Sequence, residues 1–284
     1  MGRLYPRMRE RPSEFRLNPT APLANALVLA WIPSATCWGS MRMMDLSPYS
    51  WHGELQNISP SYWKWSPHLN RIVTEHNTIS VNRIVLAHNP FFHFDGSSFS
   101  VSIWAYARTW AGTTRIFEKQ EAEKSPYQGW TLLWWSGSLG FSVGDTAGVS
   151  AKSGFSSPPI NTWLHLVGVY HRGSHIILYA NGVAQNPGTD KGVGSLATTR
   201  ALTVGNYDPG TRSQNFNGFL GDAMIWSRPL SAAEVQAMTD PSNVDLRVGG
   251  VPLILPPRRR FWPVVSEQAI PKMVPWHLFQ QVSA

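Results

Sequence analysis

Tryptophan is the residue type in this sequence that points most directly to chemistry. The chain has 14 Trp among 284 residues. An exposed indole can stack on a sugar ring or fill a protein pocket, because it offers a large flat apolar face and one N–H donor. Trp134 and Trp135 are adjacent in a segment with strand character, so one must face the core and the other outward. The candidates for a glycan-binding or partner-binding surface are Trp110, Trp130, Trp134, Trp135 and Tyr207.

The titratable residues do not form a pattern typical of an enzyme. Nine His are spread along the chain without the spacing of metal ligands, and no Ser, His and Asp can be combined into a triad. His165 lies on the same side of a predicted strand as Trp163 and Val167, which predicts a packed core residue rather than a base or ligand. The sequence therefore predicts a protein without catalytic residues and without a bound metal.

The segment from Trp163 to Gly182 predicts a strand pair around which the rest of the chain is organised. Residues 163–170 and 175–180 are rich in β-branched and aromatic residues, and a polar turn containing Gly173 separates them. Asn181–Gly182 predicts a second tight turn, because both residues tolerate the positive φ of a type I′ turn.

Further short strands, separated by Gly, Ser and Asn, predict an all-β sandwich of two antiparallel sheets. A single short helix is expected near the C-terminal end, where Ser231 and Glu234 form a capping box and Pro241 stops the helix near Thr239. The other strands are predicted at 25–32, 79–86, 90–94, 99–105, 115–119, 130–135, 139–143, 201–204 and 216–226, with a turn and short strand at 45–55 and a loop at 63–70.

Composition excludes a disordered protein and a small scaffold held together by disulfides. Hydrophobic residues make up 43% of the chain, enough for a large core, and charged residues only 14%, against about 25% in typical domains. Cys37 is the single cysteine, which excludes an intrachain disulfide and indicates a reducing compartment. We find no secretion signal and no apolar run long enough to span a bilayer, so membrane insertion is not expected.

Both ends of the chain are predicted to be extended arms, at 1–24 and 241–284, flanking a sandwich at 25–240. The arms are rich in Pro and Arg, lack periodicity, and carry much of the net charge of +7. A run of three Arg is typical of a solvated or carboxylate-paired segment, so nucleic acid is not the expected partner. The residues predicted to dock on other subunits are Arg7, Arg11, Phe15, Arg258, Arg259, Arg260, Trp262 and Trp276.

Four motifs follow one another along the chain: Phe99–Trp104, Trp163–Tyr170, Leu178–Gly182 and Phe216–Glu234. In order and spacing they resemble the laminin-G-like domains of the concanavalin A-like lectin/glucanase superfamily. The resemblance covers residues 23–240 and is most specific over 98–238. It implies a jelly-roll sandwich of two curved sheets that binds glycans or proteins on its concave face or rim loops, although fold alone does not determine function.

The sequence departs from that superfamily where catalysis would occur. Its glucanases carry alternating Glu, Asp and Glu on one strand, because glycoside cleavage needs two carboxylates about 5 to 10 Å apart. The nearest equivalents here are Glu118, Glu121 and Glu123, which are interleaved with Lys119 and Lys124 and predict a charged loop.

Related domains often bind calcium, and the resemblance implies Asp95, Asp208 and Asp222 as candidate ligands. Calcium takes about six to eight oxygen ligands, whereas these three residues are isolated in the sequence. Ordinary roles in turns and at strand ends are therefore favoured, and no other cofactor is implied.

Three classes of protein remain: a structural or attachment protein, a stand-alone glycan-binding lectin, and a glycoside hydrolase. The two arms favour the first, because a subunit of a multimeric assembly gains affinity from multivalent contacts. By analogy, a lectin-like sandwich without a secretion signal is typical of a tailed-phage virion component, either a capsid decoration or a tail-associated attachment protein, assembled in the host cytoplasm. Its expected partners are neighbouring capsid or tail proteins, with surface glycans as further ligands.

Overall fold

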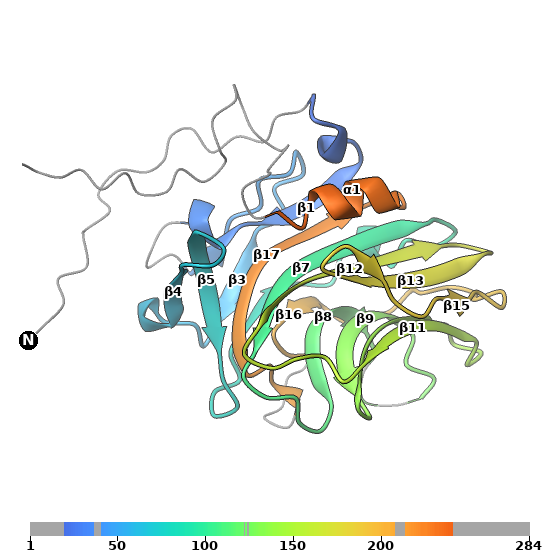
Figure 1. Cartoon of the computed structure of the whole chain (residues 1–284). Coiled ribbons are helices and arrows are strands. Elements are labelled where there is room, and N and C mark those ends of the chain that lie inside the picture. Colours follow the sequence, from blue (N-terminus) through green and yellow to red (C-terminus); the bar gives the residue numbers. More distant parts are fainter. Residues whose placement is uncertain (1–19, 37–40, 122, 124, 208–213, 241–284) are drawn as a thin grey trace, which may run out of the picture. The chain divides into compact units, whose positions relative to one another are not determined.

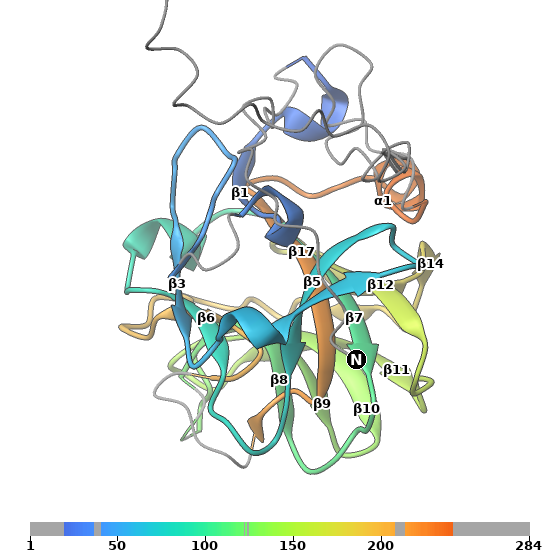
Figure 2. The same ribbon diagram turned by 90° about the vertical axis from the view of Figure 1, so that its left-hand side faces the viewer.

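The computed structural model describes residues 20–36, 41–121, 123, 125–207 and 214–240. Within them the strands form two antiparallel sheets of nine and eight strands, which pack face to face (Figures 1 and 2). The predicted all-β, two-sheet sandwich is confirmed. Residues 1–19 and 241–284 lie outside the described residues, and with them Arg7, Arg11, Phe15, Arg258, Arg259, Arg260, Trp262 and Trp276.

The nine-stranded sheet, called sheet A, has the order β14-β13-β12-β7-β17-β5-β4, with β1 also paired to β17 and β15 to β13. Its strands are β1 (Leu27–Trp31), β4 (Trp63–Ser66), β5 (Arg71–His76), β7 (Phe99–Ala107), β12 (Trp163–His171), β13 (His175–Ala180), β14 (Val183–Ala184), β15 (Gly188–Thr189) and β17 (Gly218–Trp226).

The eight-stranded sheet, called sheet B, has the order β11-β10-β9-β8-β16-β6-β3-β2. Its strands are β2 (Arg42–Met43), β3 (Gly53–Gln56), β6 (Arg83–Leu86), β8 (Thr114–Gln120), β9 (Gly129–Trp135), β10 (Ser138–Gly144), β11 (Ser150–Ser156) and β16 (Leu202–Val204). Short 3-10 helices are η1 (Pro22–Ala24), η2 (Pro33–Ala35), η3 (Pro60–Tyr62) and η4 (Pro90–His93), and α1 spans Ala232–Ala237. None of these described helices has the length and apolar character needed to cross a bilayer.

The main core lies between the two sheets, where inward-facing side chains alternate with outward-facing ones along each strand. Phe99 of sheet A packs on Trp130 and Phe141 of sheet B, with ring centroids 5.8 and 6.0 Å apart. Gly168 on β12 makes room for this packing, because a Cβ at that position would lie 2.5 Å from the Phe141 ring. The sandwich thus depends on close aromatic packing across its middle.

The strand pair predicted at 163–182 is confirmed. β12 and β13 are antiparallel, with His171 opposite His175. β14 follows through Asn181 and Gly182, which have φ values of 49° and 77° as a type I′ turn requires.

The structure corrects several strand assignments, among them the strand predicted at 79–86, of which only Arg83–Leu86 is extended as β6. Residues 90–93 form η4 rather than a strand, because Pro90 has no N–H for a sheet and Asn89 caps the turn. Residues 63–66 form edge strand β4 where a loop was predicted, and β5 follows it. The unpredicted β11 is rich in Ser and Gly, which have low strand propensity.

The described fold also begins before Asn25, where the sandwich was predicted to start. Ala21 and Leu23 are buried, and Trp226 Nε1 donates a hydrogen bond to the Leu23 carbonyl oxygen at 2.7 Å. At least these residues of the predicted N-terminal arm therefore belong to the core.

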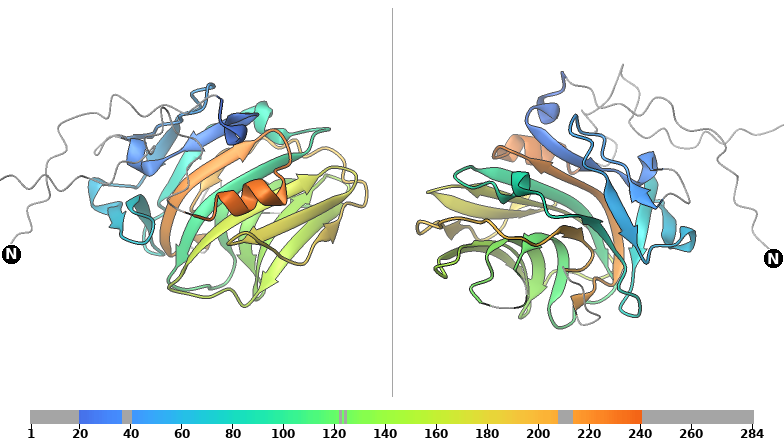
Figure 3. Two further views of the ribbon diagram at one scale, coloured as in Figure 1. Left: turned by 45° about the horizontal axis from the view of Figure 1, so that its top comes forward. Right: turned by 180° about the vertical axis from the view of Figure 1, so that it is seen from behind.

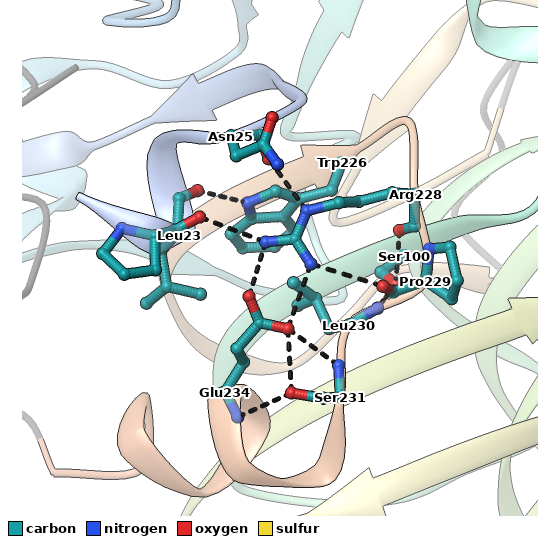
Figure 4. A network of polar contacts seen from close by, with 10 residues as sticks. Leu23, Asn25, Ser100, Trp226, Arg228, Pro229, Leu230, Ser231 and Glu234 are labelled. Atoms are coloured by element: carbon teal, nitrogen blue, oxygen red, sulfur yellow. Dashed lines mark hydrogen bonds and ion pairs between the residues drawn. The ribbon is translucent and has the colours of Figure 1, made fainter. Parts of the chain in front are cut away.

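Helix α1 lies across the outer face of sheet A, where Val235 shares a buried cluster with Val167 and Trp226 (Figure 3). Both halves of the predicted capping box of Ser231 and Glu234 are present. The Arg228 guanidinium donates to both Glu234 carboxylate oxygens, at 2.5 and 3.0 Å, and its Nε donates to the carbonyl oxygen of Asn25 (Figure 4). This network ties the helix to the N-terminal segment.

We predict that Glu234→Gln destabilises the fold in a pH-dependent way. The hydrogen bonds from Arg228 lower the pKa of Glu234 from 4.5 to about 2. A lowered carboxyl pKa contributes stability that is present above pH 4.5 and is lost as the pH falls toward 2. For this partly exposed pair we expect a loss of about 1 to 2 kcal/mol in the free energy of unfolding at pH 7.

Urea unfolding of the wild type and Glu234→Gln at pH 7, 4 and 2.5 measures this difference. The gap between the two proteins should shrink on the acid side. An equal gap at all three pH values would contradict the assignment.

Candidate ligand-binding site

The loop that joins β2 to β3 is built around the buried carboxylate of Asp45. Its oxygens accept backbone N–H bonds from Ala30, Ser47 and Trp51 at 2.7, 2.9 and 2.7 Å, and the Ser47 hydroxyl donates at 2.6 Å. A buried carboxylate is stable only with such partners. The carboxylate therefore fixes the turn that carries Tyr49 and Trp51.

The segment before β7 displays Phe91. The Asn89 side chain accepts the Phe91 backbone N–H at 2.9 Å, and Pro90 suits the first position of η4. The next residue, Phe92, is fully buried, and its carbonyl oxygen accepts a hydrogen bond from Trp130 Nε1 at 2.9 Å. Phe91 is 39% exposed, so one phenyl ring anchors the segment and its neighbour faces solvent.

Tyr49, Trp51 and Phe91 form one group, which we call the aromatic ledge. The ring centroids of Tyr49 and Phe91 are 5.2 Å apart, and Trp51 lies 6.2 Å from each of the other two. The Tyr49 and Trp51 rings are nearly parallel, with an interplanar angle of 8°. The ledge thus joins two loops that lie far apart in the sequence.

A surface pocket of about 430 Å³ lies beside the ledge and shares Phe91 with it. Its described lining adds the apolar Pro90 and Phe94 and the polar His93, Asp95, Ser97 and Ser227.

The polar groups of this pocket are held in place by a neighbouring segment. Asp95 accepts the Leu196 backbone N–H at 2.7 Å and the Ser195 hydroxyl at 3.1 Å. The ring Nε2 of His93 bonds to the Thr198 carbonyl oxygen at 2.9 Å, and burial lowers the pKa of His93, so its ring is neutral at pH 7. Asp95 is therefore the one charged side chain in the described lining.

The predicted aromatic residues do not converge on one site. Trp110 and Trp134 stack with centroids 5.5 Å apart, both half-buried against the core. Trp135 lies on the other side of its strand and is 55% exposed, which confirms the predicted opposite orientation of the two neighbours.

Trp130 and Tyr207, also predicted as binding residues, are corrected to interior positions. Trp130 faces inward with Leu132, and its hydrogen bond to the Phe92 carbonyl oxygen holds the segment that carries Phe91. Tyr207 is only 4% exposed, and its carbonyl oxygen accepts a hydrogen bond from Arg83 Nη1 at 2.6 Å. Neither side chain is available to a ligand in this structure.

The carboxylates considered for catalysis are engaged elsewhere. Glu118 is buried on β8, not in a charged loop, and accepts hydrogen bonds from Arg115 and Thr131, both at 3.1 Å. Glu121 and Glu123 both pair with Arg200.

The residues considered as metal ligands or bases are also separated. Asp222 is buried against Arg71, Asp95 lies in the pocket, and Asp208 is outside the described residues. No three His, Cys, Asp or Glu side chains of the described residues are grouped as metal ligands. His165 is buried beside Trp104, which confirms its predicted core position, and burial lowers its pKa to about 3.

Comparison with protein families identifies the class of protein. Residues 80–236, more than half of the chain, match the laminin-G family model of the concanavalin A-like lectin/glucanases superfamily. The chain belongs to this family. A search of curated proteins finds no match.

Solved structures share the fold at low sequence identity. The binding domain of Paraclostridial Mosquitocidal Protein 1 has a TM-score of 0.57 and 16% identity over 77% of this chain and 52% of its own. A botulinum neurotoxin type C structure, from work on cell entry through two ganglioside molecules, has a TM-score of 0.56 and 16% identity over 78% and 52%. The chain spans about half the length of these toxin chains.

A third structure is matched over almost its full length. Domain 4 of AbnA, an extracellular GH43 arabinanase from Geobacillus stearothermophilus solved with arabinotriose, has a TM-score of 0.53 and 18% identity over 75% of this chain and 98% of its own. At these identities the likeness establishes the fold alone.

We predict that Asp45→Asn destabilises the protein by about 2 to 4 kcal/mol, because it removes the charge that four hydrogen bonds stabilise and replaces an acceptor by an NH₂ group. Urea unfolding measures the change. Glu54→Gln, at an exposed position on β3, is the matched control and should change the free energy of unfolding by less than about 0.5 kcal/mol. Equal effects of the two variants would contradict the role of Asp45.

Proposed function

We propose that the chain is a non-catalytic recognition protein that binds carbohydrate at the aromatic ledge and the adjacent pocket. The observation that carries this proposal is the position of three exposed or half-exposed rings beside hydroxyl, imidazole and carboxylate groups. A sugar ring has an apolar C–H face and a hydroxyl edge. The face can stack on Tyr49 or Phe91 while the edge bonds to the pocket.

The charge of the pocket narrows the ligand. Asp95 is an acceptor for sugar hydroxyls and would repel a carboxylated sugar at close range. The neutral His93 ring offers no compensating positive charge. We therefore infer a neutral oligosaccharide as the ligand.

The same pocket supports a non-catalytic role. Hydrolysis of a glycoside needs two carboxylates on either side of the scissile bond. Asp95 is the single carboxylate in the described lining. Glu118, Glu121 and Glu123 are not part of this lining, and they form ion pairs with Arg115 or Arg200.

Related structures support ligand binding on this framework. The arabinanase domain was solved with arabinotriose, cell entry of botulinum neurotoxin type C depends on two ganglioside molecules, and a neurotoxin DC binding domain was solved with rat synaptotagmin II. These are ligands of the related proteins, and we propose glycan binding for this chain.

A second proposal concerns where the protein acts. The Pro/Arg/Trp-rich sequences at both ends favour a subunit that docks on neighbouring proteins, in the form of a phage virion component such as a capsid decoration or tail-associated attachment protein. Density-gradient fractionation of producing cells, followed by detection of the protein, tests this role. Co-sedimentation with particles is expected, and recovery only in the soluble fraction would contradict it.

For the carbohydrate site we predict that Tyr49→Ala and Phe91→Ala each weaken binding of a neutral oligosaccharide about five- to tenfold, the value of one aromatic stacking contact. The ligand is first selected on a glycan array, and affinity is then measured by isothermal titration calorimetry.

Tyr127→Ala is the matched control, because Tyr127 is 48% exposed and Tyr49 46%. It should leave affinity unchanged. The proposal fails if no neutral glycan binds, or if Tyr49→Ala and Phe91→Ala bind as the wild type does.

A further inference from the structure

A second surface, on the outer face of sheet B, has glycine at its centre. Gly140 of β10 pairs with Gly154 of β11 on one side and with Leu133 of β9 on the other. Each alternates with core residues of its own strand, so all three belong to the outer face. We call these three residues the glycine floor.

Neither glycine of the floor is required by the fold. Neither has a positive φ. A Cβ at Gly140 or Gly154 would meet only backbone carbonyl oxygens, at 3.4 and 3.6 Å, which contrasts with the filled space at Gly168. Glycine inside a strand weakens it and often marks a place where a ligand approaches the backbone closely.

Two exposed side chains meet over this part of the sheet. Trp135 lies on β9 opposite Ser138, and Lys152 lies on β11 opposite Ser142, so the Gly140 row runs between them. The Lys152 ammonium nevertheless lies 5.5 Å from the centre of the Trp135 ring. An indole face and a positive charge are thus brought together over the half-exposed Gly140 row.

We propose that this surface binds an acidic polysaccharide composed of uronic acid units. A sugar ring would lie against Trp135 and the glycine floor, and its carboxylate would pair with Lys152. Ser138 and Ser142 are half-exposed and lie on the rows to either side of Gly140. Their hydroxyl groups would bond to sugar hydroxyls.

The charges on this face favour such a ligand. Within the described residues Lys152 contacts an indole and forms no ion pair with a carboxylate. The nearby Glu118 is buried and bonded to Arg115, so it does not oppose an anion at the surface. One ammonium matches the single carboxylate of a uronic acid, whereas the closely spaced phosphates of a nucleic acid call for several cations.

This site is independent of the aromatic ledge. The ledge belongs to the 45–51 and 89–97 loops and has a carboxylate beside it, whereas the glycine floor belongs to β9, β10 and β11 and has an ammonium. The two would therefore bind sugars of different charge.

Affinity electrophoresis of the full chain in gels containing polygalacturonate or neutral galactan tests the proposal. We expect polygalacturonate to retard both the wild type and Tyr49→Ala, and galactan not to retard Tyr49→Ala. Trp135→Ala and Lys152→Gln should each raise the dissociation constant at least fivefold, and Gly140→Val should do the same by filling the floor. Trp135 and Lys152 are exposed, so their variants are expected to fold. Thermal unfolding shows whether Gly140→Val also folds.

Lys191→Gln is the matched control, because it removes the same charge from another exposed position. It should bind as the wild type does, and so should Tyr49→Ala at the ledge, which separates this proposal from the first. The proposal is overturned if polygalacturonate does not bind, if galactan retards Tyr49→Ala as much as polygalacturonate does, or if Lys191→Gln weakens binding as much as Lys152→Gln. Full competition by single-stranded DNA would instead assign the surface to nucleic acid.

Discussion

Burial of apolar side chains between the two sheets is the constraint on which the rest of the structure depends. Because side chains alternate along a strand, each inward position is committed to the core, and only outward positions and loops are left for recognition. On β9 this alternation buries Trp130 and Leu132 and leaves Trp135 exposed. Within the part of the chain that the structure describes, most tryptophans therefore serve packing, and a binding role falls to the few rings that packing leaves exposed.

The displayed aromatic groups are held by buried polar contacts. Asp45 bonds to three backbone N–H groups around the loop of Tyr49, and Trp130 bonds to the carbonyl of Phe92, directly after Phe91. Loops fixed in this way lose little conformational entropy when a ligand binds, which raises affinity. The core thus does more than stabilise the sandwich, since it also positions the rings that face solvent.

Local patterns in the sequence predicted most of the fold. Asn181–Gly182, the capping box at Ser231 and the alternation after Phe99 each depend on neighbours within a few residues. The candidate site depends on contacts between distant segments, and no local pattern places Tyr49 beside Phe91. Tyr49 and Trp51 follow Asp45 in a turn, which was their one available signal. Glu118 was mistaken for a loop residue because its partners, Arg115 and Thr131, are identified only by the sheet register.

We propose that an aromatic group carried by loops at the surface of this lectin-like sandwich recognises a neutral sugar without cleaving it. Titration of the isotope-labelled chain with its selected oligosaccharide, followed by NMR, tests this most directly. We expect the largest shifts at the amides of residues 49–51 and 91–97, with the glycine floor unchanged and the oligosaccharide intact. Shifts confined to other regions of the chain, or cleavage of the sugar during the titration, would contradict the account.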